Sequence, residues 1–214
     1  MNGVPLGEWY LEIPIITRAY MTVCTAIAVA VTLNVLSPID LCLSFPLVYE
    51  KGEYYRILTN FTYFEGLGIN FFIHIHFVYT YFRRSEQHSY HRNTADFVAM
   101  VLFGACILLV ASYFLEVLFL SLPLMYYVLY IWCRRNPYEH MHVLGVMPVP
   151  APYLPYLFVL VSYALDNPIH DDVLGILTGH TFWFLADIVP KLTGYPVLKT
   201  PGFLKALFPE PVLR

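Results

Sequence analysis

The residues best suited to catalysis in this chain lie within apolar segments. His180 directly follows a GILTG sequence, and three serines lie in other apolar runs: Ser112, Ser121 and Ser162. A serine protease needs a serine within hydrogen-bond reach of a base, together with donors that face the oxyanion. Ser121 has bulky neighbours, and no GxSxG sequence occurs. We therefore expect His180 to be a hydrogen-bonded structural residue at least as much as a functional one, and an intramembrane serine protease is a minor alternative.

Gly175 and Gly179 form a GxxxG spacing, which places two residues without side chains one helical turn apart on the same face. Another helix can approach such a face closely. Inside a bundle of several helices most of these pairs are used internally, so the pattern favours packing within the chain over a dimer face.

Other polar side chains interrupt the apolar segments: Asn60, Asn70 and Asp187. In hydrocarbon such groups, like His180, must find internal partners or water. The pattern favours interhelical hydrogen bonds, and the alternative is a hydrated groove that thins the barrier. Tyr55 and Arg56 lie at the membrane edge of the first long polar segment. A guanidinium beside an aromatic ring is expected there to extend into the lipid headgroups and anchor the loop.

No sequence pattern predicts a metal or cofactor. His74 and His76 are two residues apart, so on a helix they face different sides and cannot ligate a metal as an i, i+4 pair does. Neither a GxxxxGK sequence followed by Ser or Thr nor a GxGxxG sequence occurs, so no nucleotide-binding loop is expected. The four cysteines are isolated, so neither a zinc site nor a disulfide framework is expected.

The composition places the elements that carry these residues in a membrane. Of the 214 residues 58% are apolar and 13% are charged, and the mean hydropathy is +0.60. Soluble domains are roughly 45–50% apolar and about 25% charged. The net charge of −3 supplies no basic excess for a phosphate backbone, which argues against nucleic-acid binding. Polar residues form short clusters between apolar runs, so we expect one membrane domain over residues 1–214.

Six apolar segments approach the roughly 20 residues that a helix needs to cross a bilayer core about 30 Å thick. They predict an all-α protein with six transmembrane helices at 19–36, 66–82, 95–115, 117–132, 143–165 and 173–189. Residues 1–18 are expected to form a cytosolic interfacial segment, and 190–214 a cytosolic tail. Several segments are short, which indicates tilt or local thinning of the bilayer. Prolines at the start of the fifth segment predict an irregular entry into that helix.

Basic residues predict the orientation, because Lys and Arg are retained on the cytosolic side. With six crossings, ten of the twelve Lys and Arg residues fall on one side, and only Lys51 and Arg56 fall on the other. Both termini are therefore predicted to be cytosolic. The N-terminal segment lacks a basic region and carries Glu8 and Glu12, which favours a signal anchor over a cleavable signal peptide.

Short sequences spread over nearly the whole chain resemble the Derlin family: EIP at 12–14, TRAY at 17–20, YRILTNF at 55–61, TADFV at 94–98, RRNPY at 134–138, APYLP at 151–155, GILTGH at 175–180 and KTP at 199–201. The resemblance implies a rhomboid-like fold with six spans in the endoplasmic reticulum membrane, both termini cytosolic, and a pseudoprotease without a catalytic nucleophile. The family's first-loop motif is Trp-Arg, so Arg56 matches it while Tyr55 replaces the indole. Gly175 and Gly179 match the GxxxG of the sixth span.

The function that this resemblance implies is a role in endoplasmic-reticulum-associated degradation. Such a protein recognises misfolded polypeptide clients and assists their return to the cytosol, together with a membrane ubiquitin ligase complex and the AAA ATPase valosin-containing protein. Some family members assemble as homo-oligomers. Many Derlins bind the ATPase through a tail box that contains glycine and phenylalanine. The sequence ends at Arg214 without that box, so we expect another protein to recruit the ATPase unless a longer chain carries the box.

The physical hypothesis is that short spans and polar membrane residues thin and hydrate the lipid locally. This would lower the cost of moving unpaired backbone groups across the bilayer. No covalent chemistry is expected, and the energy would come from a partner. A small transporter or channel is the second alternative. It predicts internal repeats with broken helices, and the two halves of the chain show no duplicated pattern.

Overall fold

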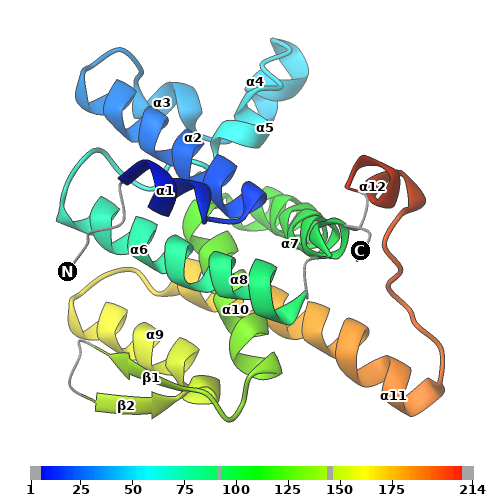
Figure 1. The fold of residues 1–214 in the computed structure, drawn as a ribbon. Coiled ribbons are helices and arrows are strands. Elements are labelled where there is room, and N and C mark those ends of the chain that lie inside the picture. Colours follow the sequence, from blue (N-terminus) through cyan, green and yellow to red (C-terminus); the bar gives the residue numbers. More distant parts are fainter. Residues whose placement is uncertain (1–5, 91–92, 144–146, 209–214) are drawn as a thin grey trace.

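The computed structural model describes residues 6–90, 93–143 and 147–208, and most of them are helical. Figure 1 shows the helices gathered around α8 (Ser121–Arg135). This helix contacts four others: α6 (Ile69–Arg84), α7 (Thr94–Leu115), α9 (Leu154–Ala164) and α10 (His170–Trp183). The prediction of a mainly helical protein is confirmed.

α8 forms the centre of the protein because almost every one of its side chains is buried. All residues from Pro123 to Cys133 are buried, and three of them are tyrosines. A tyrosine hydroxyl in such a core needs a partner. Tyr127 donates to the carbonyl oxygen of Met100 on α7 at 2.7 Å, and the Tyr130 hydroxyl lies 2.7 Å from Nδ1 of His180 on α10. The tyrosines therefore join the central helix to its neighbours.

α2 (Ile15–Thr32) packs against α6, and a buried carboxylate holds its first turn. Glu86 lies in the π-helical turn Ser85–Ser89 after α6 and accepts hydrogen bonds from the backbone N–H groups of Ile16 (3.2 Å) and Thr17 (2.9 Å). It also accepts one from the Thr17 hydroxyl at 2.7 Å. The first N–H groups of a helix lack partners within the helix and carry positive partial charge, so the carboxylate stabilises this end.

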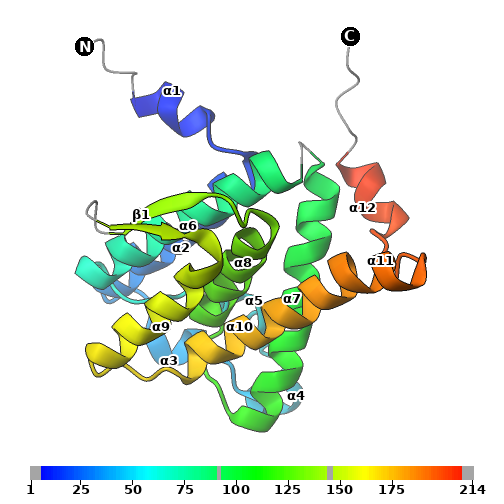
Figure 2. The ribbon, with the colours of Figure 1, turned by 90° about the horizontal axis from the view of Figure 1, so that it is seen from below.

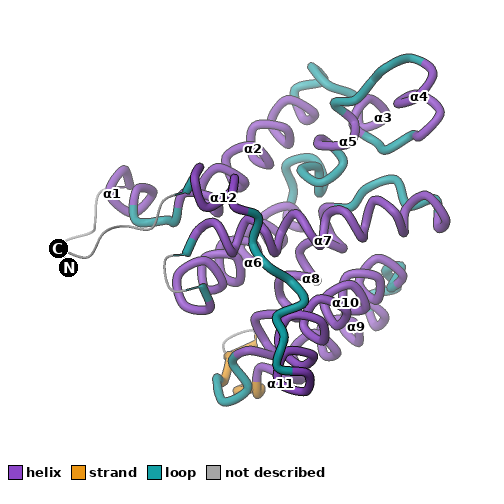
Figure 3. Tube along the Cα trace, turned by 90° about the vertical axis from the view of Figure 1, so that its right-hand side faces the viewer, coloured by secondary structure: helices purple, strands orange, loops and turns teal. Residues whose placement is uncertain are grey.

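The two ends of the bundle carry different segments. Figure 2 shows α1 (Leu6–Leu11) and α12 (Gly202–Leu207) at one edge, and α3 (Pro38–Leu41) and α4 (Phe45–Glu50) at the opposite edge. Figure 3 shows the same separation from another side, with α5 (Arg56–Thr59) beside α3. We call the end with α3, α4 and α5 the first-loop end. α6 and α8 each finish with two arginines at the other end, which we call the basic end.

Three helical segments of the described chain are long and apolar enough to cross a membrane: Ile15–Thr32, Thr94–Leu115 and His170–Thr193. The last combines α10, a π-helical turn (Phe184–Ile188) and α11 (Val189–Thr193). α6, α8 and α9 lie at three further predicted spans and have 16, 15 and 11 residues, and α6 continues into the π-helical turn Ser85–Ser89. At 1.5 Å per residue the α-helical parts are about 24, 22 and 16 Å long, and those of α8 and α9 are well short of a core of about 30 Å. Six crossings therefore stay a prediction.

The predicted helix at 143–165 is wrong in its first part, and the all-α class misses a small sheet. β1 (His140–Val143) pairs antiparallel with β2 (Met147–Pro150), and α9 begins only after the 3-10 turn Ala151–Tyr153. The cause is local, because Pro148 and Pro150 lack the N–H group that a helix interior needs, whereas an edge strand tolerates them. The irregular entry that the prolines predict is this hairpin.

The other helices differ from the predicted spans by a few residues at their ends. α2 ends at Thr32 and Asn34 has a φ of 56°, so the predicted span 19–36 is displaced towards the C-terminus. α8 begins at Ser121 rather than at 117, because the chain first turns through Glu116, whose φ is 54°. The predicted interfacial segment 1–18 contains α1 and the first turn of α2. The predicted tail 190–214 contains most of α11 and all of α12.

Candidate functional site

A polar cavity of about 280 Å³ lies between α6, α8, α9 and α10 at the first-loop end of the bundle. Apolar side chains form most of its wall. Its polar lining residues come from α6, α8, α9, α10 and the loop before α10: Asn70, His74, Tyr126, Ser162, Asn167, Asp171 and Asp172. A mainly apolar hollow with a few convergent polar groups is the default candidate for a binding site.

Asp172 is the most deeply buried polar group of this cavity. It lies in the first turn of α10, and only 1% of the residue is exposed. Its carboxylate interacts with the hydroxyls of Ser162 on α9 and Tyr126 on α8, which lie 3.5 Å from each other. Within the described residues its Oδ2 atom has no hydrogen-bond partner. A buried carboxylate oxygen without a partner is unfavourable unless a donor, a water molecule or a cation reaches it.

His74 lines the cavity from α6. Its ring stacks on Phe64 with 5.4 Å between the ring centroids. Its Nδ1 atom is buried and has no hydrogen-bond partner within residues 6–90, 93–143 and 147–208. Among the described residues, α6 and α10 therefore each present a buried polar atom without a hydrogen-bond partner. The described residues contain no cluster of three His, Cys, Asp or Glu side chains that could hold a metal ion.

Four aromatic rings, which we call the aromatic partition, close the cavity towards the basic end: Phe77, Tyr81, Trp132 and Phe158. Phe77 of α6 meets Phe158 of α9 edge to face, with centroids 4.7 Å apart. Tyr81 stacks on Phe77 at 5.7 Å and contacts Trp132 of α8 at 5.5 Å. A second cavity of about 460 Å³ lies beyond them, and its lining residues include Thr80, Arg83, Arg84 and Asn136. The partition therefore separates two polar cavities along α6.

Gly175 and Gly179 pack α10 against α8 within the chain. A Cβ atom on Gly175 would overlap the carbonyl oxygen of Pro123 and come within 2.6 Å of the Tyr126 Cβ. On Gly179 a Cβ would lie 3.0 Å from the Tyr130 Cβ. α10 can approach α8 this closely only because both residues lack a side chain. Asp172 precedes Gly175 by three residues, so the same approach brings its carboxylate to α8.

His180 and Asp187 have protein partners and do not line the polar cavity. His180 bonds to Tyr130, as described above. Asp187 accepts two hydrogen bonds from Arg135 at the end of α8, at 2.9 and 3.0 Å. Interhelical hydrogen bonds, the interpretation that the sequence favoured, are therefore present at these two residues.

Ser121 and His180 do not form a catalytic pair in this structure. Ser121 Oγ donates to the carbonyl oxygen of Tyr63 at 2.5 Å. The partner of His180, Tyr130, follows Ser121 by nine residues on the same helix, which is about 13 Å along the axis. Ser112 donates to the carbonyl oxygen of Leu109, and Ser162 lies in the polar cavity.

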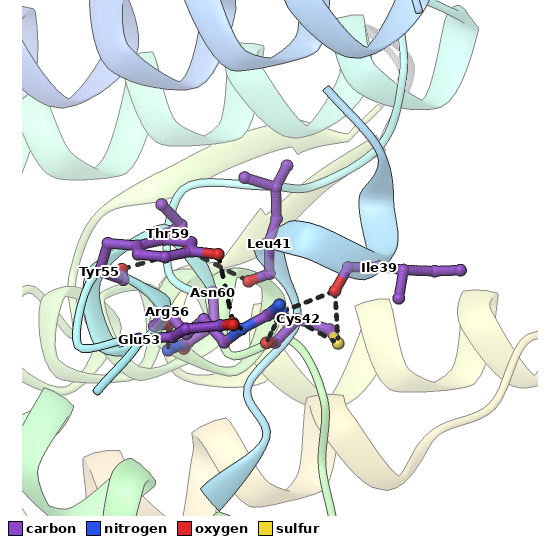
Figure 4. Close-up of polar contacts among 8 residues, drawn as sticks. All are labelled: Ile39, Leu41, Cys42, Glu53, Tyr55, Arg56, Thr59 and Asn60. Carbon is purple, nitrogen blue, oxygen red and sulfur yellow. Dashed lines mark hydrogen bonds and ion pairs between the residues drawn. The ribbon is translucent and has the colours of Figure 1, made fainter. Parts of the chain in front are cut away.

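Arg56 connects segments of the first loop by hydrogen bonds, and its side chain does not extend towards lipid. Its Nε donates to Glu53 Oε2 at 2.6 Å, and its Nη1 donates to the carbonyl oxygens of Ile39 (2.7 Å) and Cys42 (3.1 Å) (Figure 4). Only 4% of Arg56 is exposed. The expectation that its guanidinium extends into the headgroups is therefore wrong, because loop acceptors already satisfy it. Tyr55 is exposed, and its ring centroid lies 5.5 Å from the guanidinium carbon.

Asn60 also serves the first loop. It follows α5 directly and donates to the carbonyl oxygens of Arg56 (2.6 Å) and Ile57 (3.0 Å). The hydrogen bond from Arg56 lowers the pKa of the Glu53 carboxyl below its ordinary value of 4.5. Of the four polar residues that the sequence singled out in or near the membrane, Asn70 is the one that lines the polar cavity.

The burial of Asp172 could have been predicted from the sequence, although the pattern of apolar segments and polar interruptions does not indicate it. Asp172, Gly175 and Gly179 are spaced i, i+3 and i+7, so they share one face of a helix. If the two glycines mark a close helix contact, the carboxylate on the same face must be carried into it.

Comparison with known proteins connects this arrangement to one family. The sequence profile of the Der1-like family matches residues 13–202. A probable derlin-2 homolog of Dictyostelium discoideum is 39% identical over 95% of this chain and 83% of its own length. Derlin-2.2 of Arabidopsis thaliana is 38% identical over 96% and 89%, and Derlin-1.2 of Zea mays is 36% identical over 92% and 82%. The matched range contains the polar cavity, the aromatic partition and the first loop.

Proposed function

Because this chain belongs to the Der1-like family, we propose that it acts in endoplasmic-reticulum-associated degradation. It engages misfolded polypeptides and assists their return from the lumen or membrane to the cytosol. In this proposal the chain crosses the endoplasmic reticulum membrane six times with a rhomboid-like fold. The basic end and both termini face the cytosol, and the first-loop end faces the lumen, in line with the distribution of Lys and Arg.

The observation that carries the proposal is the polar cavity beside helices that are short for a membrane. α9 forms one of its walls and has 11 residues, so lipid next to it must thin to match its length. A hydrated hollow at the same place offers hydrogen-bond partners to the backbone of a passing chain. Unpaired backbone groups are the main cost of an extended chain in hydrocarbon, so the two features together lower the barrier.

The aromatic partition limits this path to one half of the membrane. Phe77 and Phe158 meet at the floor of the cavity, so the chain offers a luminal groove that stops at the rings. The client then has to move the rings or use a second protein to complete the crossing. A membrane ubiquitin ligase complex, or further copies of this chain, would supply that second protein.

No covalent step belongs to this proposal. The separation of Ser121 from His180 supports a protein that binds and releases without cleaving. The sequence has no nucleotide-binding loop, so a partner supplies the energy of extraction, as the AAA ATPase valosin-containing protein does in the family that the sequence resembles.

Site-specific photo-crosslinking tests the proposal. A photoreactive amino acid at Val161, a half-exposed residue of the cavity wall on α9, should crosslink to a misfolded client, and the crosslink should accumulate when extraction is blocked. The same replacement at Val110, an exposed residue of α7, is the matched control. Equal crosslinking at the two positions, or none at Val161, would remove the cavity from the function.

A further inference from the structure

We infer that the polar cavity recognises a basic side chain of its client, with the Asp172 carboxylate as the acceptor for a lysine ammonium or an arginine guanidinium. This inference rests on the proposed function and adds the chemical class of the client segment: a membrane-inserted or partly inserted stretch of polypeptide that carries one unpaired positive charge.

The first argument is the unused hydrogen-bond acceptor of Asp172. Only 1% of the residue is exposed, and its Oδ2 atom has no hydrogen-bond partner within the described residues. The residue lines the cavity, so the buried acceptor lies beside a space that another molecule can enter. A charged donor makes a stronger hydrogen bond to a carboxylate than a neutral donor does, especially where water is scarce.

The second argument is the charge balance of the cavity. Of the described residues that line the cavity, none is Lys or Arg. The imidazole of His170 lies outside the described lining of the cavity and is 67% exposed, 3.3 Å from Asp171 Oδ1. His74 faces the cavity from α6, Asn70 lies on the same helix, and Tyr126 and Ser162 contribute hydroxyls from α8 and α9. The described lining of the cavity therefore holds two carboxylates, one imidazole and no permanent positive charge.

The third argument is the size and position of the space. A cavity of about 280 Å³ is at the lower limit of pockets for small ligands and suits one long side chain. Ile73 of α6 and Val161 of α9 are half exposed at its rim, so it opens towards lipid. A lone lysine or arginine is among the most unfavourable residues in a membrane helix. A membrane chain in which such a residue has no counter-ion is therefore misfolded. Asp172 offers such a residue the counter-ion that it lacks.

Binding of two peptides that differ at one position tests the inference. The full chain is reconstituted in liposomes, and a labelled 22-residue Leu/Ala helix with a single Lys in its luminal third is compared with the same helix carrying Gln. We expect the Lys peptide to bind about tenfold more tightly by energy transfer, which corresponds to about 1.4 kcal/mol. Asp172→Asn should abolish this ratio by weakening the Lys peptide alone, because the amide keeps the shape and loses the charge.

Asp166→Asn is the matched control. It removes one acidic charge from the exposed loop before α10, and asparagine tolerates the positive φ of 59° at this position. This variant should keep the tenfold ratio. Unchanged binding of the Gln peptide to Asp172→Asn shows that the variant is folded.

The outcomes separate the inference from the proposed function. If the wild-type chain binds both peptides equally, or if Asp172→Asn keeps the preference or weakens both peptides alike, charge recognition by Asp172 is overturned while client binding stands. If neither peptide binds the wild-type chain, both the inference and the proposed engagement of membrane-inserted clients are overturned.

Discussion

Gly175 of α10 lies so close to Tyr126 of α8 that a Cβ atom at position 175 would come within 2.6 Å of the Tyr126 Cβ. The Tyr126 hydroxyl in turn faces the polar cavity, 3.5 Å from Ser162 Oγ and in contact with Asp172. The packing of the two helices and the chemistry of the cavity thus depend on one contact. Any change that moves α10 away from α8 also separates Asp172 from the hydroxyls beside it.

Gly175→Ala should therefore lower the melting temperature of the purified protein in detergent, and it should do so more than Gly179→Ala. The added methyl group at 175 overlaps a backbone carbonyl that cannot rotate away, whereas at 179 the nearest atoms are 3.0 Å distant. Overpacking of this kind costs about 1–3 kcal/mol. Gly202→Ala is the control, because a Cβ there meets nothing within 4 Å. Equal melting temperatures for Gly175→Ala and Gly202→Ala would contradict the packing role.

Arg56→Ala should loosen the first loop without unfolding the helices. The change leaves Glu53 without its cation and removes the donor to the carbonyl oxygens of Ile39 and Cys42. Cys42 Sγ donates to the Ile39 carbonyl oxygen at 3.1 Å in the intact loop, so its reaction with 2,2′-dithiodipyridine, followed by peptide mass spectrometry, should become several times faster. Lys51→Ala removes the other cation of the loop and should leave this rate unchanged. An unaltered rate in Arg56→Ala would show that the network does not hold the loop.

The same loop should be stable at neutral pH and open in acid. The hydrogen bond from Arg56 lowers the pKa of Glu53 below 4.5. A lowered folded-state pKa means that the stabilisation is present above the ordinary value and is lost as the pH falls through the folded value. Cys42 reactivity, measured with the same reagent relative to a free thiol, should therefore rise only below about pH 4.5. In Glu53→Gln this acid step should be absent, and an identical step in that variant would assign it to another group.

The parts of the fold that follow from short-range pattern were predictable. The apolar runs located the helices, and the spacing of Gly175 and Gly179 predicted a close helix contact, because both depend on residues within two turns. The prolines indicated an irregular segment where the hairpin β1–β2 lies. The central position of α8 was not predictable, because it depends on how four other helices surround its tyrosines.

The errors at the site have a common cause. Arg56 resembled a lipid anchor because two of its acceptors are backbone oxygens of Ile39 and Cys42, 17 and 14 residues earlier in the chain, and no side chain marks them. The pattern of apolar segments did not single out Asp172, because its burial requires Ser162 and Tyr126 from two other helices. A polar residue's role was predictable where its partner was local, and not where folding supplies the partner.

Phe158→Ala should join the two polar cavities along α6. Phe158 meets Phe77 edge to face at 4.7 Å, and removal of its ring leaves a space between two hollows that both contain polar groups, which water can then fill.

A cysteine replacing Thr80, which lines the cavity at the basic end, reports the change. The protein is placed in sealed vesicles with its first-loop end facing the interior, and an impermeant methanethiosulfonate reagent is enclosed inside. Under these conditions Thr80→Cys should react only when it is combined with Phe158→Ala. Phe114→Ala, at an exposed residue of α7, should not permit the reaction. Reagent added at the basic end should reach the cysteine in every variant, which shows that each is folded. If Thr80→Cys reacts from the first-loop end while Phe158 is intact, the rings do not form the barrier, because the cavities are then already continuous.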